Sequence, residues 1–468
     1  MSATETTSTI TNGDVSFWIR DAGGRPTPRP ALNGDIDVDV AIIGAGLTGL
    51  WTAYYLKTAR PDLEVAVIEQ EFAGFGASGR NAGWMSAEPA GQFRRYAATH
   101  GPEAARDLQR EMFGAIREAA QIARSEDFGN AVTETGLIHF ASNQAQLARA
   151  KSHIREMKHQ GWGEEDVQEL SAADIQERVR VRGALGGYGT QHCVRVHPAK
   201  FVFGLARAVE RRGVTIYEGT KATAVAPRVV TTERGQVRAK HIVEALEGYS
   251  LSLPGQHRRL LPMNSSMIIT EPLSDSVLES IGWAGGELLG DVAHSFTYMH
   301  KTADSRIAIG GRGVPYNFAS SFNRDGRTAE VTVQSLRNRL AEIFPILRDV
   351  RIDHTWTGVL GVPRDWCAAV NYDSATGIAR AGGYVGHGVS GTNLAARTVA
   401  DLLLGKETAL TRLPWVGRQA RNWEFEPVRW IGAKALYAAY GYADRRENAT
   451  QNPQTHVLAR IANIVSGR

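Results

Sequence analysis

The chain has 468 residues, of which 43% are hydrophobic and 22% charged, and this composition is ordinary for a globular enzyme. Its 53 basic and 49 acidic residues leave a net charge of only +4, which does not favour nucleic-acid binding. Two cysteines are too few for a disulfide framework, and the polar N-terminus does not have the pattern of a secretory signal, so we predict a cytoplasmic protein.

The first predicted unit is a strand, a turn, a helix and a second strand. Residues 1–36 are rich in Gly and Pro and are predicted to form an arm that leads into the fold. Residues 38–43 form a β-rich run suited to a strand buried on both faces, residues 50–56 have helical spacing, and residues 64–68 form the second strand. The order indicates a βαβ unit.

The rest of the chain alternates helical and β-rich stretches. Short β-rich runs with one helix between residues 259 and 355 predict a mostly antiparallel sheet. The final segment, 412–468, is rich in Trp and Arg and is predicted to be mainly helical. Other predicted strands are 135–140, 214–217, 239–243, 266–270 and 306–309; predicted helices are 143–160, 201–212 and 333–344, and a strand, turn and helix follow at 377–404.

A glycine-rich turn joins the first strand to its helix. Gly44 allows a tight turn, Gly46 lets a phosphate approach the backbone, and Gly49 lets the helix and strand pack closely. Glu69 ends the second strand, where a carboxylate can accept hydrogen bonds from a ribose. An acid at this position favours an unphosphorylated ribose, so the motif predicts FAD or NAD and does not separate the two.

Three further motifs carry a resemblance to a known family. They are Gly76-Ala-Ser-Gly-Arg-Asn-Ala-Gly83, the pair 296–300 and 306–312, and Ala381-Gly-Gly-Tyr-Val-Gly-His-Gly-Val-Ser390. Their sequence, order and spacing resemble the FAD-dependent amine and amino-acid oxidoreductases of the D-amino-acid-oxidase type, which include glycine oxidase, sarcosine oxidase and the γ-glutamylputrescine-oxidase-like group. The resemblance covers most of the chain.

The resemblance implies an α/β fold. We expect a Rossmann-like FAD-binding domain of the glutathione-reductase type, an inserted and mostly antiparallel β-sheet substrate domain, and a helical C-terminal tail. The expected boundaries are 1–36 for the N-terminal arm, 37–133, 196–258 and 356–411 for the FAD-binding domain, 134–195 and 259–355 for the substrate domain, and 412–468 for the C-terminal extension.

The resemblance also implies which residues surround the FAD. Ser78 and Asn81 supply hydrogen bonds beside the flavin, Arg80 supplies charge, and the turn before residue 388 opens a helix whose N-terminus stabilises the reduced flavin. The expected FAD-binding residues are Gly44, Gly46, Leu47, Thr48, Gly49, Glu69, Gln70, Gly76, Ser78, Arg80, Asn81, Ala82, Ala222, Gly386, His387, Gly388 and Val389. We expect noncovalent FAD, because Cys367 does not align with the cysteine that attaches flavin in sarcosine oxidases.

On the substrate side the sequence departs from the family twice. Leu360 stands where the amino-acid oxidases have a carboxylate-binding arginine, which favours an amine substrate. Ala308 stands near the place of the lysine that helps sarcosine-oxidase-like enzymes to activate oxygen, so the electron acceptor, oxygen or another, is left open. The implied reaction is hydride transfer from the carbon next to nitrogen onto the flavin, followed by hydrolysis of the imine.

The candidate catalytic side chains are Tyr298, His300 and His387 at the ring, with Arg312 as the carboxylate ligand of the alternative reading. That alternative is an amino-acid or N-methyl-amino-acid oxidase or dehydrogenase. Trp84 and Trp356 are candidates either for the wall of an amine pocket or for plain core packing. From a different class, the chain could be a non-catalytic flavin-binding protein, and a monooxygenase is disfavoured because no second dinucleotide motif is present.

Two other features of the sequence have more than one interpretation. A single cysteine lies between His192 and His197 with no fourth ligand in view, so we predict no metal site. The aromatic residues of the tail suit either a peripheral membrane contact that passes electrons to a quinone or, as we favour, docking on the protein's own lobes. They are Trp415, Trp423, Trp430 and Tyr437. The oligomeric state stays open.

Overall fold

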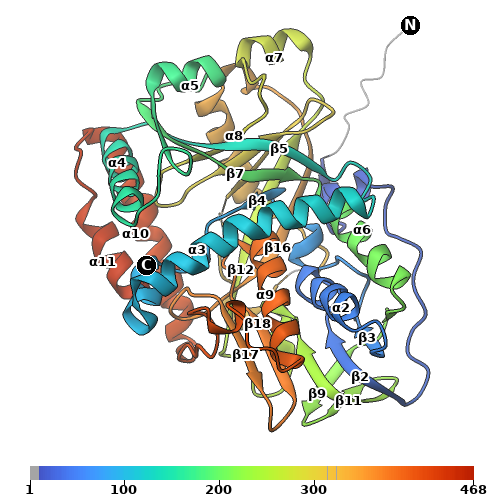
Figure 1. Ribbon diagram of the computed structural model, residues 1–468. Coiled ribbons are helices and arrows are strands. Elements are labelled where there is room, and N and C mark those ends of the chain that lie inside the picture. The colour runs from blue at the N-terminus through green and yellow to red at the C-terminus, as the bar shows by residue number, and fades with distance from the viewer. Residues whose placement is uncertain (1–9, 312, 314, 323, 468) are drawn as a thin grey trace, which may run out of the picture.

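The computed structural model describes residues 10–311, 313, 315–322 and 324–467. Within these residues the strands form two sheets, one of eight strands and one of ten, in two lobes (Figure 1). The predicted α/β fold with a second, mostly antiparallel sheet and a helical C-terminal end is confirmed. No described helix is both long enough and apolar enough to cross a bilayer.

The eight-stranded sheet contains the predicted βαβ unit. Five parallel strands run side by side at its centre, in the order β18, β11, β2, β3 and β8, and the edge strand β17 is antiparallel. Their bounds are Ile378–Gly382 for β18, Gly235–Glu244 for β11, Ile36–Ile43 for β2, Val65–Ile68 for β3, Thr215–Tyr217 for β8 and Ala369–Asp373 for β17; a hairpin of β9 (Ala222–Ala226) and β10 (Val229–Thr232) extends β11.

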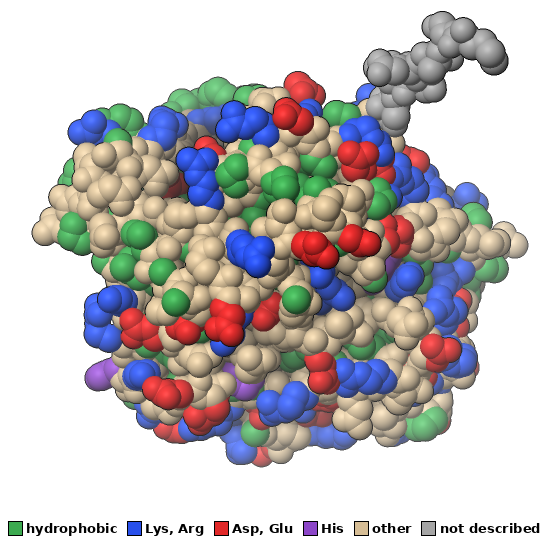
Figure 2. Space-filling model, turned by 90° about the horizontal axis from the view of Figure 1, so that it is seen from above, with side chains coloured by type: hydrophobic (Ala, Val, Ile, Leu, Met, Phe, Trp, Pro, Cys, Tyr) green, Lys and Arg blue, Asp and Glu red, His purple; other side chains and the backbone are tan. Residues whose placement is uncertain are grey.

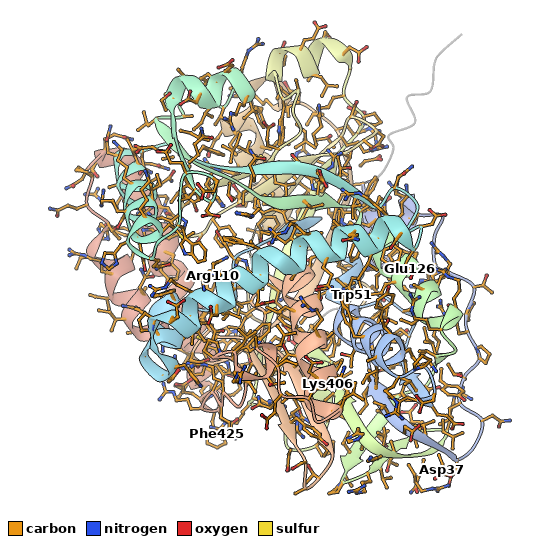
Figure 3. The ribbon with its side chains drawn as sticks, viewed as in Figure 1. Asp37, Trp51, Arg110, Glu126, Lys406 and Phe425 are labelled. Atoms are coloured by element: carbon orange, nitrogen blue, oxygen red, sulfur yellow. The ribbon has the colours of Figure 1, made fainter. Side chains whose placement is uncertain are left out.

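Helices cover this sheet because its central strands are apolar on both faces. Val65–Ile68 is buried along its whole length. The covering helices are α2 (Leu47–Ala59), α6 (Pro198–Arg211) and α9 (Gly388–Leu403), with α2 packed on both of the others. Trp51 of α2 is fully buried, whereas Asp37, Lys406 and Phe425 lie at the periphery (Figure 3).

The ten-stranded sheet forms the second lobe and is mostly antiparallel. Its order is β1-β16-β12-β15-β14-β13-β5-β7-β4, and β6 also pairs with β7. The bounds are Thr11–Asn12 for β1, Ile352–Val362 for β16, Leu261–Thr270 for β12, Ile307–Gly311 for β15, Tyr298–Lys301 for β14, Leu288–Asp291 for β13, Val132–Ala141 for β5, Gly186–Val196 for β7, Trp84–Ser86 for β4 and Gln168–Ser171 for β6. The helices α5 (Ala172–Arg178), α7 (Asp275–Ile281) and α8 (Glu330–Ile343) lie on the outer side of this lobe (Figure 1).

A long helix, α3 (Phe93–Ser125), runs along the junction between the lobes and is absent from the sequence analysis (Figure 1). Its buried face includes Leu108, Met112 and Ile116, and it packs on α9. Gly101 has a positive φ of 84°, and Pro102 follows it, so the helix has a kink near its start. The kink separates two helical patterns, which weakens the periodic signal in the sequence.

Part of the N-terminal segment is docked on the second lobe. β1 pairs with β16, and α1 (Phe17–Asp21) begins at Ser16, whose hydroxyl accepts a hydrogen bond from the backbone N–H of Ile19. Phe17 and Trp18 are buried against Trp356. The Gly- and Pro-rich composition of residues 1–36 hides this short apolar helix.

The C-terminal tail consists of α10 (Val428–Thr450) and α11 (Val457–Ser466), which lie beside α4 (Gln144–His159) in Figure 1. Trp415 and Trp423 are 1% and 8% exposed, and the indole N–H of Trp423 donates to the carbonyl oxygen of Val362 at 2.7 Å. Trp430 and Tyr437 are half-buried against the core of the first lobe. Figure 2 shows basic and acidic side chains interspersed on the face seen from above.

Candidate functional site

The glycine turn after β2 has room only for hydrogen at its critical positions. Gly44 has a φ of +102°, and a Cβ atom there would lie 2.8 Å from the carbonyl oxygen of Ala245. A Cβ atom at Gly49 would lie 2.0 Å from the carbonyl oxygen of Gly44. The turn therefore keeps backbone open to a phosphate group at the N-terminus of α2, as a dinucleotide cradle requires.

The loop around residue 78 sits on this helix start. The hydroxyl of Ser78 accepts a hydrogen bond from the backbone N–H of Leu47 at 2.8 Å, and a Cβ atom at Gly46 would lie 3.0 Å from the same oxygen. Thr48 lies 3.2 Å from the hydroxyl of Tyr384, oxygen to oxygen. The first glycine motif and the third family motif therefore meet at the N-terminus of α2.

Glu69 lies beside the same turn. Its carboxylate accepts hydrogen bonds from the backbone N–H groups of Ala45 at 2.8 Å and Glu71 at 2.9 Å. Loss of hydration raises the pKa of Glu69 to about 7 against the lowering effect of these two donors. Gln70 follows with its amide beside the guanidinium of Arg324. The carboxyl group is thus fixed where a ribose would complete its hydrogen bonding.

Arg80 supports the backbone of the loop. Its guanidinium is buried and donates to the carbonyl oxygens of Phe75 at 2.8 Å, Arg324 at 2.8 Å and Thr357 at 3.3 Å. Loss of hydration lowers its pKa. With its donors directed to carbonyl oxygens, Arg80 shapes the loop, and the expected role as a charge beside the cofactor stays a prediction.

Asn81 is tied into the same loop. Its side chain donates to the carbonyl oxygen of Ser78 at 2.7 Å and accepts from the backbone N–H of Gly83 at 2.8 Å. The backbone carbonyl oxygen of Asn81 accepts a hydrogen bond from the indole N–H of Trp18 at 2.9 Å. Gly76 precedes the 3₁₀ turn η1 (Ala77–Gly79), which starts this loop.

The third motif turns into α9 with an unusual backbone. Val385 and Gly386 have positive φ values of 52° and 107°, and His387 is the N-cap of the helix that begins at Gly388. Val389 is buried in the first turn. The N-terminus of α9 therefore faces the cavity described next.

Glu247, which the sequence analysis did not identify, holds the strand that leads into this turn. Its carboxylate accepts from the backbone N–H groups of Gly383 at 2.9 Å, Tyr384 at 3.2 Å and Gly361 at 3.3 Å. Loss of hydration raises its pKa to about 7. No sequence motif marks Glu247, which lies three residues beyond the end of β11.

A cavity of about 840 Å³ lies between the lobes. Its lining comes from the ten-stranded sheet, from α3 and α4, and from the loops at residues 77–82 and 385–387, and it includes Ala82, Trp84, Tyr298, Leu360, Gly386 and His387. Such a volume suits a flavin ring together with a small substrate.

Of the candidate catalytic residues, Tyr298 and His387 face this cavity. The hydroxyl of Tyr298 is hydrogen-bonded to the hydroxyl of Ser265, which also lines the cavity. His300 is 2% exposed and packs against Trp18, and burial lowers its pKa to about 3. Arg312 lies outside the described residues.

The two tryptophans have different places. Trp84 lines the cavity, with its ring 6.1 Å from that of Tyr298. Trp356 is fully buried and donates its indole N–H to the carbonyl oxygen of Arg80 at 2.9 Å. Leu360 lines the cavity and Ala308 is buried in the core beside Trp356.

Ala222 and the two cysteines lie away from the cavity lining, whereas His192 is part of it. Ala222 begins β9 and is half-buried against the sheet. Cys193 and Cys367 are unpaired and buried, and burial raises the pKa of the Cys367 thiol to about 11. His192 hydrogen-bonds Asp166, whereas His197 caps α6, so these two histidines have separate surroundings.

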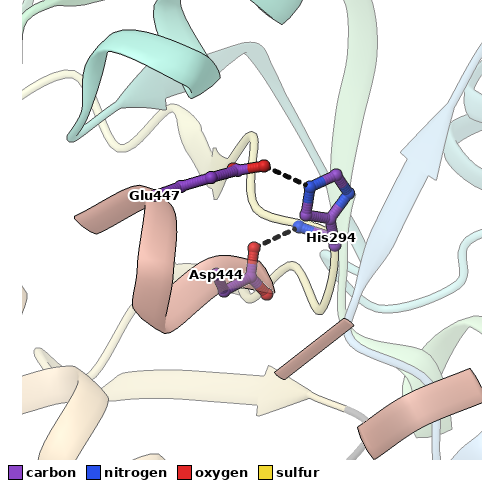
Figure 4. Close-up of side chains that lie close together, drawn as sticks. All are labelled: His294, Asp444 and Glu447. Carbon is purple, nitrogen blue, oxygen red and sulfur yellow. Dashed lines mark hydrogen bonds and ion pairs between the residues drawn. The ribbon is translucent and has the colours of Figure 1, made fainter. Parts of the chain in front are cut away.

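A cluster of His294, Asp444 and Glu447 brings three potential metal ligands within 4.8 Å of one another (Figure 4). A cation is already present there, because the guanidinium of Arg149 lies 2.8 Å from Glu447 and 3.1 Å from the His294 ring nitrogen. Asp444 accepts from the backbone N–H groups of His294 and Ser295. The cluster fastens α10 to α4 and to the loop after β13, and we name it the tail clasp.

Comparisons with known proteins agree with this geometry. The chain is 31% identical over 402 residues to γ-glutamylputrescine oxidoreductase of Escherichia coli, and this alignment covers 84% of this chain and 89% of that protein. It is 25% identical over 343 residues to sarcosine oxidase subunit beta of Rhodobacter capsulatus, and this alignment covers 70% of this chain and 75% of that protein. Glycine oxidase from Geobacillus kaustophilus has the same fold, with a TM-score of 0.68, 20% identity and coverage of 82% of this chain and 99% of that one.

The family match explains why both glycine motifs and the cavity occur together. Residues 39–402 match the family described as DAO, FAD dependent oxidoreductase, and this range contains the glycine turn and the three motifs that carry the resemblance. The resemblance noted in the sequence is confirmed: this chain belongs to the DAO family of FAD-dependent oxidoreductases.

Proposed function

We propose that this enzyme oxidises the C–N bond of a small primary or secondary amine to an imine, which water then hydrolyses. The observation that carries the proposal is the cavity, which joins the turn before α9 to an apolar surface that includes Leu360 and Met267. When bound, FAD supplies the acceptor for the hydride that leaves the carbon next to nitrogen. Gly44, Gly46 and Glu69 would hold the dinucleotide part of the cofactor.

The chain's own residues position the amine and exclude water. The hydroxyl pair of Tyr298 and Ser265 offers a polar anchor for the amine nitrogen. Trp84, Met267 and Leu360 provide the apolar surroundings in which a neutral amine is favoured over an ammonium ion. A neutral nitrogen has the lone pair that hydride loss from the adjacent carbon requires, so no strong base is needed at this position.

An amino-acid or N-methyl-amino-acid substrate is the alternative. The names of the relatives span both classes. In the described lining, the guanidinium of Arg80 already donates to carbonyl oxygens, that of Arg94 to the side-chain oxygen of Gln92, and that of Arg149 to Glu447, which supports the amine. Oxygen or another acceptor completes the cycle, and the two unpaired cysteines support a cytoplasmic location.

The test mixes the purified holoenzyme anaerobically with amines, N-methylated amines and amino acids and follows the flavin absorbance. We expect amines to bleach the flavin band, and the colour to return on admitting the true acceptor. If only amino acids bleach it, the alternative holds. A yellow protein that no compound bleaches would be a non-catalytic flavoprotein.

A variant tests the polar anchor. We expect Tyr298→Phe to keep its FAD and to lower the rate of anaerobic flavin reduction by about tenfold, the effect of one lost hydrogen bond. Tyr442→Phe is the control, because Tyr442 is 43% exposed on α10 and does not line the cavity. If the flavin of the two variants is reduced at equal rates, Tyr298 does not anchor the amine.

A further inference from the structure

Most buried charges in the cavity lining are already paired. Asp166 lies 2.8 Å from a ring nitrogen of His192, and Asp291 lies 2.9 Å from the guanidinium of Arg339. The guanidinium of Arg149 belongs to the tail clasp. These groups have their charge compensated within the protein and offer little to a ligand.

Glu88 is different. It lies two residues after β4, its side chain is 47% exposed, and it lines the cavity. The Nδ1 atom of His387 lies 3.8 Å from the carboxylate, beyond hydrogen-bond distance, and no group in the described part of the chain donates to the carboxylate. Loss of hydration raises the pKa of Glu88, but the fields of His387, His139 and His153 outweigh it and hold the pKa below its ordinary value. Glu88 therefore stays ionised and lacks a close partner.

An aromatic wall stands beside this carboxylate. His139 and Tyr188 face each other across the paired strands β5 and β7, with their rings stacked at 4.8 Å. His153 of α4 covers Tyr188 from another side at 4.6 Å, and Trp84 meets His139 edge to face at 6.2 Å. Burial lowers the pKa of His139, whereas the charge of Glu88 raises it. Trp84 and Tyr188 line the same cavity as Glu88, and aromatic rings of this kind favour a cation as their neighbour.

We propose that Glu88 and this aromatic wall bind a second, protonated nitrogen of the substrate, so that the substrate is a diamine or polyamine. The inference rests on the proposed amine oxidation. The apolar surface at Leu360 and the anchor at Tyr298 receive the neutral, reacting nitrogen, and Glu88 receives the ammonium group at the other end. A charge-assisted hydrogen bond to a partly desolvated carboxylate distinguishes such a substrate from a monoamine.

The first experiment compares α,ω-diamines with n-alkylamines and ω-amino acids of the same chain length on the holoenzyme, by anaerobic flavin reduction. We expect the diamines to be favoured in kcat/KM by about tenfold or more, the effect of one charge-assisted hydrogen bond. In Glu88→Gln that preference should disappear while the monoamine rates stay unchanged. Glu156→Gln is the matched control, since it makes the same charge change at an exposed position of the same lining.

Three results would overturn the inference. Glu88→Gln could slow monoamines and diamines equally, which would place Glu88 at the reacting nitrogen. The ω-amino acids could be the preferred substrates, which would require an anion site at the distal end. Glu88→Gln and Glu156→Gln could reduce the preference for diamines equally, which would show that only the total negative charge of the cavity lining matters.

A binding measurement separates this inference from the proposed function. Bis(trimethylammonium)alkanes carry two positive charges and no nitrogen lone pair, so they cannot lose a hydride, and their binding shows as a change in the flavin absorbance. Because they have no N–H group, they test the charge of Glu88 and not its hydrogen bond: we expect Glu88→Gln to raise their Kd by about tenfold and to leave the Kd of a neutral n-alkanol of the same chain length unchanged. If no amine reduces the flavin, the proposed function fails, whereas these Kd values still test Glu88; unchanged values, or no binding to the wild type, reject the site.

Discussion

At the scale of single residues, Glu69 and Glu247 carry the clearest consequence for stability. Burial raises the pKa of each to about 7 from an ordinary value of 4.5. Between these values the folded protein binds more protons than the unfolded chain, so their contribution to stability is complete below pH 4.5 and is lost as the pH rises through 7. We expect the FAD-free protein to lose thermal stability from pH 5 to pH 8, by at most about 1.4 kcal/mol per pH unit for each group.

The measurement is the Tm of the FAD-free protein across this range, and Glu69→Gln should flatten part of the slope. Glu64→Gln, at the exposed start of the same strand, should leave the slope unchanged. A slope that is equal in all three proteins would show that Glu69 titrates normally. The sequence located Glu69 through its motif, but it gave no sign of Glu247, because the partners of Glu247 are backbone N–H groups more than a hundred positions away.

At the scale of elements, the βαβ unit shows what a local pattern can predict. The strands β2 and β3 and the helix α2 were predictable because their burial follows from contiguous residues. A substitution tests the fit: Gly49→Ala places a Cβ atom 2.0 Å from the carbonyl oxygen of Gly44, so α2 must move away from the turn. We expect loss of FAD binding and a fall in stability of about 1–3 kcal/mol, the usual cost of overpacking.

Gly114→Ala in α3 is the matched control, since an added Cβ atom there meets nothing within 4 Å. It should raise stability by about 0.5–1 kcal/mol because alanine is the better helix former. FAD content and chemical unfolding report both effects, and equal behaviour of the two variants would refute the packing argument. The helix α3 is harder to predict than α2, because the Gly101-Pro102 pair interrupts its pattern and because its buried face packs on α9, which is distant in the sequence.

At the scale of the whole molecule, the tail clasp joins the C-terminal extension to the second lobe. The sequence predicted a helical tail but could not predict the clasp, because Arg149 and Glu447 lie 298 positions apart. Loss of hydration raises the pKa of Glu447, but hydrogen bonds from His294, the backbone and Arg149 lower it to about 2. The pKa lies below the ordinary 4.5, so the stabilisation is present above pH 4.5 and is lost as the pH falls through about 2.

The clasp makes the tail part of one cooperative structure, and Arg149→Met tests this. The substitution leaves the carboxylate of Glu447, whose side chain is 2% exposed, buried without its arginine, which costs about 3–5 kcal/mol. We expect limited proteolysis to cleave the tail faster than in the wild type while the core keeps its FAD, because the flavin motifs lie outside the clasp. Arg446→Met, the control, removes an exposed positive charge from α10, the helix that carries Glu447, and should leave the rate of proteolysis unchanged. If both variants resist protease as the wild type does, the tail is held by its buried tryptophans, and the clasp contributes little to its docking.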